Sequence, residues 1–162
     1  MKDINRKIEK VVINTGVGSI KDKPGFSDKI LPEIVKDLSL ITGQKPSPIK
    51  AKRSIAGFKV REGEVVGLKV TLRGKMMVDF ISKVINIVLP RVRDFRGLNR
   101  SSVDHLGNLN LGFKDKQVFP EINADKSKVD FGLQITIVPK DRDLESALEI
   151  YKELKVPFKK EE

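Results

Sequence analysis

Residues 66–73 alternate in character, and this alternation constrains the fold more than any other feature of the chain. The apolar residues are Val66, Leu68, Val70 and Leu72, and between and after them come Gly67, Lys69, Thr71 and Arg73. Successive side chains of a β-strand point to opposite faces, so the segment predicts a strand with one buried face and one cationic, polar face. The cationic, polar face is free to lie against a nucleic-acid backbone.

Other segments divide between helical and strand periodicity. Apolar residues recur at three- and four-residue spacing in segments 30–41, 77–88 and 144–154, which predicts three helices. Segments 8–13 and 130–138 predict two further strands, whereas the Gly- and Asn-rich segment 101–121 is expected to be irregular. We therefore predict one α+β domain spanning residues 1–162. In it, helices pack on one face of a mainly antiparallel sheet, and the other face of this two-layer domain is left free for a ligand.

Residues of known capping or breaking preference set the expected helix ends. Ser27 is the candidate N-cap of the first helix, and Gly43 ends it. The second helix runs roughly from residue 75 to 89, includes Ile87 on its buried side, and stops at Pro90. Asp143 caps the last helix.

The positive charge of the chain is concentrated in its middle third. The whole sequence has 32 Lys and Arg against 22 Asp and Glu, a net charge of +10. Residues 45–100 hold 14 of these basic residues and 4 of the acidic ones, whereas residues 1–44 carry +2 and residues 101–162 carry −2. Ordinary surfaces mix the two signs, so a local excess indicates a surface that meets phosphate.

Two basic stretches within the middle third are candidate RNA contacts. One surrounds Phe58 in a projecting loop at about 50–64, and the other surrounds Phe95 in segment 91–100. Arg suits phosphate, and an exposed Phe can stack on an unpaired base. Flanking Val92 and Leu98 favour a core position for Phe95, while core and exposed positions both remain open for Phe58. The candidate contacts to an RNA backbone are Lys50, Lys52, Arg53, Arg91, Arg93 and Arg96.

The sequence has few of the residue patterns that are typical of a catalytic or cofactor site. It has no Cys and a single histidine, His105, which excludes a thiolate metal site and a dyad of histidines. Gly16 and Gly18 lack the third glycine of a dinucleotide fingerprint and are better explained by a tight turn. Glu62 and Glu64 lie on a basic turn, where solvated carboxylates are expected. We therefore predict no enzymatic activity, no metal and no cofactor.

The sequence also gives no sign of a membrane. It has no apolar run as long as a membrane span, and residues 1–12 lack the apolar core of a signal peptide. From these features we expect a cytoplasmic protein without a membrane partner.

Several segments in a fixed order carry a family resemblance. They include KIEKVVINTGVG (7–18), ITGQKP (41–46), KAKRSIAGFKVREGE (50–64), GLKVTLRG (67–74), INIVLPRVRDFRGL (85–98), VFPEI (118–122) and VPFKK (156–160). A generic α+β protein has no need of RVRDFRGL. On these segments the chain resembles the family of bacterial large-subunit ribosomal protein number five, the 5S rRNA binder. The turn at 23–26 is a few residues longer than in the family pattern.

The resemblance implies a structural role in the ribosome. Family members sit in the central protuberance with other 5S-associated large-subunit proteins, hold 5S rRNA on the exposed sheet face, and contact 23S rRNA. Their 5S contacts fall here on Asn14, Gln44, Thr71 and Arg73, with Lys69 on the same strand face. Their loop toward P-site tRNA corresponds to Ser54, Ile55, Ala56, Gly57, Phe58, Lys59 and Arg61. Part of segment 93–113 is expected to meet a small-subunit head protein across the subunit interface.

Three classes of function compete for this chain. We favour a structural rRNA-binding protein over a free-standing RNA-binding regulator or chaperone that uses the same basic face. Sedimentation with large subunits separates these two. The third class, a nucleic-acid-modifying enzyme, needs a metal or acid–base cluster, and none converges in the sequence.

Overall fold

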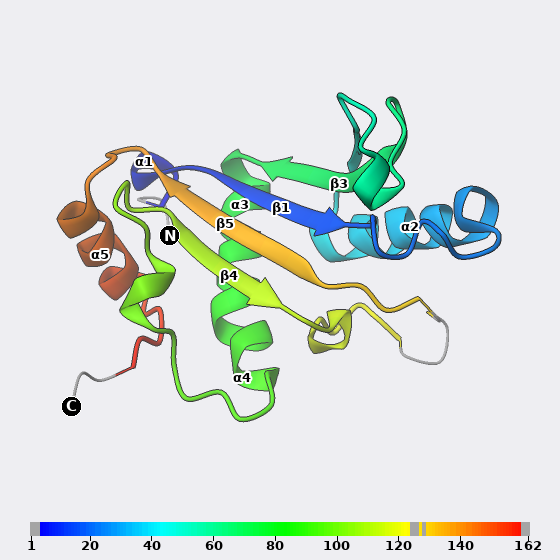
Figure 1. Ribbon diagram of the computed structural model, residues 1–162. Helices are drawn as coiled ribbons and strands as arrows, with labels where there is room; N and C mark the ends of the chain where they lie inside the picture. Colours follow the sequence, from blue (N-terminus) through cyan, green and yellow to red (C-terminus); the bar gives the residue numbers. More distant parts are fainter. Residues whose placement is uncertain (1–3, 124–126, 128, 160–162) are drawn as a thin grey trace.

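A five-stranded antiparallel sheet in the order β2-β3-β1-β5-β4 forms the centre of the protein (Figure 1). The computed structural model describes residues 4–123, 127 and 129–159. The strands are β1 (Ile8–Gly16), β2 (Ser47–Lys50), β3 (Val65–Leu72), β4 (Leu109–Phe113) and β5 (Leu133–Pro139). β1 therefore lies in the middle of the sheet, while β2 and β4 form its two edges.

The α-helices cover one face of the sheet, and no α-helix of the described segments lies over the other (Figure 1). The α-helices are α1 (Ile4–Lys7), α2 (Leu31–Thr42), α3 (Gly74–Lys83), α4 (Leu89–Arg91) and α5 (Leu144–Glu153). Wider π-helical turns, Phe26–Ile30 and Val84–Val88, lead into α2 and join α3 to α4. The predicted α+β class, with a mainly antiparallel sheet and helices packed on it, is confirmed.

The core lies between the sheet and the helices. Leu68, Val70 and Leu72 of β3 are almost completely buried, while Lys69 is exposed, as the alternation of this segment predicts. Burying a side chain of this size contributes about 1.5–3 kcal/mol. The helix side of the core comes mainly from Ile34, Leu38 and Ile41 of α2 and from Met77, Phe80 and Ile81 of α3.

The ends of α2 and α5 test the capping predictions. Gly43 ends α2 with φ 72°, a left-handed conformation that favours glycine. The Oδ2 of Asp143 accepts a hydrogen bond from the backbone N–H of Ser146 at 3.0 Å, so Asp143 caps α5 as predicted. The prediction for Ser27 is wrong, because it lies inside the π-helical turn that begins after Gly25 and makes no cap bond there.

The second helical run differs from the expectation at its C-terminal end. Ile87 is 45% exposed rather than buried, because the π-helical turn Val84–Val88 has more residues per turn and rotates Ile87 outward. The run also passes through Pro90 and ends with Arg91. Pro90 occupies the first turn of α4, where a missing N–H is tolerated, so it does not stop the helix.

The segment 101–121 is not wholly irregular, which corrects the sequence expectation. It contains β4, whose Leu109, Leu111 and Phe113 are buried and alternate with Asn110 and Gly112. The alternation covers only five residues, and its Asn and Gly are residue types that are depleted in strands. Pairing with β5 provides the stabilisation that local propensity lacks.

Candidate nucleic-acid interface

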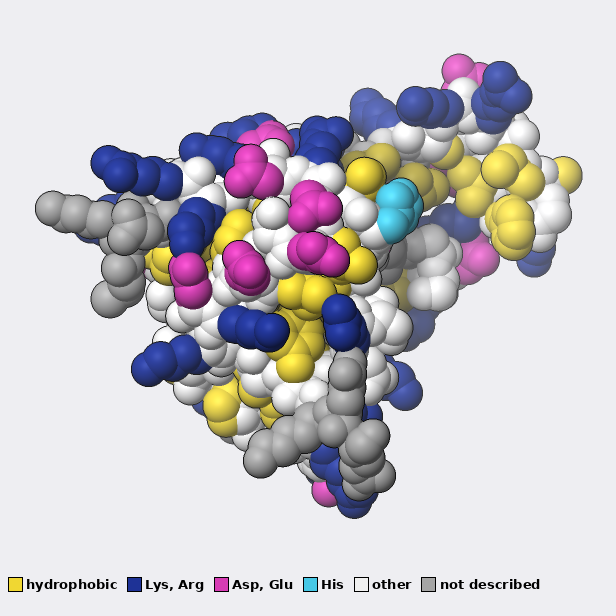
Figure 2. All heavy atoms as spheres, turned by 90° about the vertical axis from the view of Figure 1, so that its left-hand side faces the viewer, with side chains coloured by type: hydrophobic (Ala, Val, Ile, Leu, Met, Phe, Trp, Pro, Cys, Tyr) yellow, Lys and Arg dark blue, Asp and Glu magenta, His cyan; other side chains and the backbone are white. Residues whose placement is uncertain are grey.

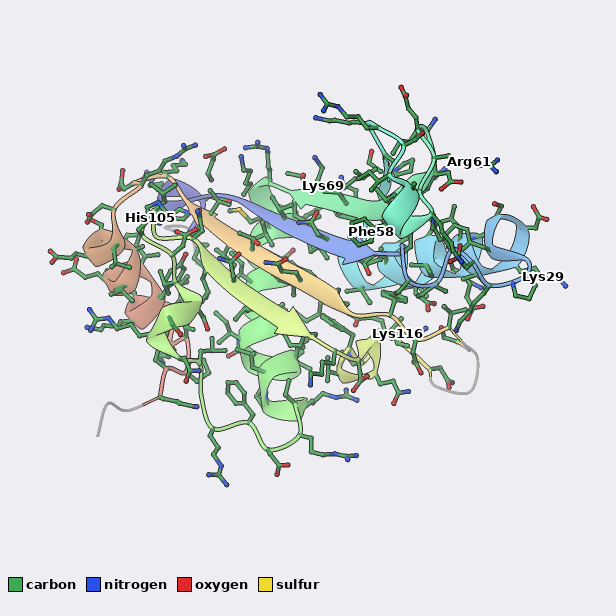
Figure 3. The ribbon with its side chains drawn as sticks, viewed as in Figure 1. Lys29, Phe58, Arg61, Lys69, His105 and Lys116 are labelled. Carbon is green, nitrogen blue, oxygen red and sulfur yellow. The ribbon has the colours of Figure 1, made fainter. Side chains whose placement is uncertain are left out.

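A row of polar side chains crosses the open face of the sheet. In register, Ser47 of β2 lies opposite Lys69 of β3, Lys69 opposite Asn14 of β1, and Asn14 opposite Gln134 of β5. Side chains directly opposite on paired strands share a face. With strands about 4.8 Å apart, the row spans roughly 14 Å. Figure 3 marks its cationic member, Lys69, on β3. We call these four residues the polar row.

A second line of polar groups runs beside the polar row. Thr71 of β3 and Thr136 of β5 both lie opposite Val12. The Thr136 hydroxyl donates to Oδ1 of Asn110 at 2.8 Å. On the other side, the Gln44 side chain donates to the backbone oxygen of Thr71 at 3.4 Å. The fold therefore brings Gln44, which lies outside the sheet, next to Thr71.

Three members of this face have polar groups available to a ligand. Within residues 4–123, 127 and 129–159, the amide of Asn14, the ammonium of Lys69 and the hydroxyl of Thr71 have no hydrogen-bond partner. Asn14 and Thr71 are half-buried between neighbouring strands, which restricts their rotamers. Donors that are fixed in direction and still unpaired are suited to bind an acceptor from outside the chain.

Arg73 lies just beyond β3 rather than within the polar row. Its Nη1 lies 3.5 Å from Oε1 of Glu9, and Lys10 donates to the same oxygen at 3.1 Å. The hydrogen bond from Lys10, followed by the charges of Lys10 and Arg73, lowers the pKa of Glu9 below its usual value. Arg73 therefore lies close to the other predicted 5S contacts, but Glu9 partly neutralises it.

The segment between β2 and β3, residues 51–64, projects from the sheet as a hairpin (Figure 1). We call it the projecting loop. Ala51 and Glu64 pair at its base, with the Ala51 N–H 2.8 Å from the Glu64 oxygen, and Ile55 and Val60 exchange hydrogen bonds nearer its tip. Phe58 is 75% exposed, so of the two positions left open by the sequence it takes the exposed one.

The predicted backbone-binding residues form two groups at opposite edges of the sheet. Lys50, Lys52 and Arg53 lie exposed at the β2 edge, where the projecting loop begins, whereas Arg91, Arg93 and Arg96 lie exposed on the segment beside β4. A groove of about 770 Å³ separates this second segment from β4. Phe95 lines the groove and packs against the core, as its apolar neighbours predict.

The end of the molecule formed by α5 has a different character. Figure 2 views this end and shows a group of acidic side chains over it, with Lys and Arg around the group. His105 is exposed here, away from Lys69 (Figure 3). Among the residues that the structure describes, no three His, Asp or Glu side chains are placed to hold a metal ion. None of the described helices is long and apolar enough to cross a membrane.

Sequence reasoning missed part of this interface. Ser47, Gln134, Thr136 and Asn110 share the open face with the predicted contacts, but none was predicted. A signal for Gln134 and Thr136 exists, because they alternate with the buried Leu133, Ile135 and Ile137. That signal identifies an exposed face but not the strand beside it, which depends on the pairing of distant segments.

An open polar sheet face with basic segments at both edges is the arrangement of an RNA-binding α+β protein. Two family models cover the chain: the model "Ribosomal protein L5" matches residues 5–61, and the model of the C-terminus of the same ribosomal family matches residues 65–158. The chain belongs to the ribosomal protein L5 family.

Similar proteins agree with this assignment. The chain is 47% identical to the large ribosomal subunit protein uL5 of Halothermothrix orenii, over 94% of this chain and 83% of the relative. It is 49% identical to the uL5 of Ruminiclostridium cellulolyticum, over 94% and 82%, and 49% identical to that of Lacticaseibacillus casei, over 95% and 83%. Family membership makes the chain a structural ribosomal protein rather than an enzyme. The predicted cytoplasmic, ribosomal location follows from the same membership.

Proposed function

We propose that the chain binds 5S rRNA with the open face of its sheet and holds it in the central protuberance of the large subunit. The observation that carries this proposal is the set of unpaired polar groups on Asn14, Lys69 and Thr71. A row of fixed donors and acceptors is suited to an irregular RNA surface, where unstacked base edges and 2′-hydroxyls are available. Gln44 and Arg73 flank these groups and extend the same contact.

Phosphate contacts are assigned to the two basic edges of the sheet. Lys50, Lys52 and Arg53 lie beside the polar row, so they neutralise the backbone of the RNA that the row binds. Arg91, Arg93 and Arg96 lie at the opposite edge of the sheet and are suited to a different RNA segment. We assign that segment to 23S rRNA.

The projecting loop is assigned to the tRNA in the peptidyl site. Exposed Phe58 lies at its tip beside Ile55 and Lys59, and the exposed Arg61 follows on the second leg. An exposed aromatic ring next to cations is suited to stack on a nucleotide while the cations hold its phosphates. Because the loop projects from the edge of the sheet, it reaches a second RNA without disturbing the one on the sheet.

The exposed part of segment 93–113 is assigned to the small-subunit head protein. The segment includes His105 and Leu106, and Leu106 is 39% exposed in a turn before β4. The remaining neighbours in the protuberance are the other 5S-associated proteins of the large subunit.

A binding titration of the full chain with 5S rRNA at rising salt tests the central proposal. Several neutralised phosphates make log affinity fall linearly with log salt, by about 0.7 to 0.9 per phosphate. Binding that does not change with salt excludes the phosphate contacts. Tighter binding to duplex DNA of the same length than to 5S rRNA excludes the assignment to 5S rRNA.

A further inference from the structure

We infer that Lys21 is a positioning residue that fixes the angle at which the projecting loop leaves the sheet. The inference rests on the proposed function, in which this loop contacts a second RNA. It identifies the residue that keeps the loop in the orientation needed for that contact.

Lys21 reaches the loop from the turn that follows β1. Its side chain is 9% exposed, an unusually low value for a lysine. Its Nζ donates to the backbone oxygen of Lys59 near the tip of the loop, and it lies 3.2 Å from Oε2 of Glu64 at the base. One ammonium group therefore bonds to both ends of the second leg of the hairpin.

The hairpin has internal order but few other attachments to the body of the protein. Its legs are joined by the pairs Ala51–Glu64 and Ile55–Val60, and the Ser54 hydroxyl accepts from the N–H of Glu62 at 2.9 Å. These few bonds do not fix the direction of the hairpin, and a two-stranded hairpin without support from the body is only marginally stable, so its paired amides open more often when that support is lost. In the part of the chain that the structure describes, Lys21 is the one side chain outside the loop that hydrogen-bonds to it.

The root of the loop makes such a brace necessary. β2 is an edge strand of four exposed residues, so it gives the first leg a weak anchor. A two-stranded ribbon attached to a weak edge strand swings unless a contact away from its root restrains it. Lys21 provides that contact, and the long, buried stem of the side chain limits its own movement.

Lys21 also changes the charge that the loop presents. The Glu64 carboxylate accepts from the backbone N–H of Arg61 at 3.0 Å and from Lys21, and these bonds lower its pKa. Loss of Lys21 therefore removes the cation that pairs with the Glu64 carboxylate. The added negative charge in a basic loop by itself weakens RNA binding. A test must separate this charge effect from the bracing effect.

Three full-chain variants separate the charge effect from the bracing effect. Lys21→Met keeps the aliphatic stem and removes the brace. Lys21→Met combined with Glu64→Gln removes the freed charge as well. Lys23→Met is the matched control, since Lys23 is an exposed lysine of the same turn whose side chain has no hydrogen-bond partner among the described residues. The measurements are amide hydrogen exchange at Ile55, Lys59 and Val60, 5S rRNA affinity, and P-site tRNA retention by ribosomes containing each variant.

If Lys21 positions the loop, hydrogen exchange at these amides is expected to be about tenfold faster in both Lys21 variants. The reason is that loss of a hydrogen bond to a charged group shifts a local opening equilibrium by that order. It also predicts lower tRNA retention in both, with 5S affinity unchanged and Lys23→Met like the parent. Unchanged exchange overturns the inference, and so does tRNA retention restored in the double variant, which leaves charge as the whole effect. If exchange rises but no loop variant alters tRNA retention, the tRNA assignment fails while the brace stands.

Discussion

The Nζ of Lys116 lies 2.8 Å from Oδ2 of Asp37, and both side chains are almost completely buried. Lys116 belongs to the connection between β4 and β5, and Asp37 belongs to α2. The same ammonium also donates to the Ser127 hydroxyl and the Val129 backbone oxygen, and it lies 5.0 Å from the centre of the Phe131 ring. This cluster holds the β4–β5 connection against the helix layer.

Removing one partner of this pair is expected to destabilise the fold strongly. Lys116→Met leaves the Asp37 carboxylate buried without its cation, which costs on the order of 3–5 kcal/mol in the free energy of unfolding. Urea denaturation of the purified chain measures the change. Lys116→Met combined with Asp37→Leu removes both charges and is expected to recover part of the loss. A single variant within about 0.5 kcal/mol of the parent contradicts the argument, because that is the range of ordinary surface changes.

A glycine in the turn before β4 is expected to resist any side chain. Gly107 has φ +78°, and a Cβ there would lie 2.6 Å from the Cβ of Ala147 and 2.9 Å from the backbone oxygen of Asp143. Its own oxygen accepts from the Tyr151 hydroxyl at 2.7 Å, so the turn cannot move freely. Gly107→Ala is expected to cost about 1–3 kcal/mol, measured by thermal or urea unfolding.

Gly112 provides the matched control for that substitution. It lies on β4, and a Cβ there would meet no atom within 4 Å. Gly112→Ala is therefore expected to leave stability nearly unchanged or slightly improved, since alanine is less flexible in the unfolded chain. Equal losses for the two alanines would show that the crowding at Gly107 is not the cause.

Asp104 is expected to give the fold a pH-dependent part of its stability. Burial tends to raise its pKa, but hydrogen bonds from the side chain and N–H of Asn108 and from the N–H of Leu106 lower it below the usual 3.8. A carboxyl with a lowered pKa stabilises the folded state above its unfolded pKa, and this contribution is lost as pH falls through the folded pKa.

The substitution Asp104→Asn tests this contribution. At pH 6 the variant is expected to be less stable than the parent, because the charge that receives three hydrogen bonds is gone. Below pH 3.8 the gap is expected to shrink, since the parent carboxyl becomes neutral as well. Urea midpoints of both proteins across this range provide the measurement, and a constant gap contradicts the assignment.

The parts of the fold that depend on local sequence patterns were predictable. The alternation at 66–73, the glycine at Gly43 and the cap at Asp143 all follow from interactions within a few residues of chain. β4 was missed because the two residues that alternate with its buried ones are Asn110 and Gly112, and only pairing with β5 outweighs their weak strand propensity. The Lys116–Asp37 pair joins positions 79 residues apart, so no local sequence pattern predicts it.

The candidate site divides in the same way. Lys69 and Thr71 follow from alternation on a single strand. Their neighbours Ser47 and Gln134 follow only from the strand order, which places β2 and β5 on either side of the β3–β1 pair. Sequence periodicity thus predicts which face is open, whereas the grouping of side chains across it depends on long-range register.

The polar row yields a direct binding prediction. Lys69→Ala is expected to weaken 5S rRNA affinity by about 1–3 kcal/mol, the range for a charge-assisted contact in a desolvated interface. Lys29→Ala is the control, because Lys29 is also exposed but lies at the far end of the α2 side of the molecule, away from Lys69 (Figure 3). Filter binding at one fixed salt concentration compares the two. Equal effects would place the 5S rRNA elsewhere on the surface.

The projecting loop is expected to be dispensable for 5S binding and necessary for the contact with tRNA. Replacing Ala56–Lys59 by a short Gly-Ser turn removes the exposed Phe58 and one cation but leaves the paired residues Ala51 and Glu64 at the base. Changes confined to an exposed loop cost little stability, so folding and 5S affinity are expected to remain close to those of the parent.

Ribosomes that carry this loop variant are then expected to lose peptidyl-site tRNA faster than the parent ribosomes. The reason is that stacking on an aromatic ring contributes about 1–3 kcal/mol per base, and the Gly-Ser turn has no ring to offer. Phe58→Leu in the intact loop separates stacking from loop length, because it keeps an apolar tip without the aromatic face. If the loop variant unfolds, or if it loses 5S rRNA while tRNA retention stays unchanged, then the loop supports the sheet and does not contact tRNA.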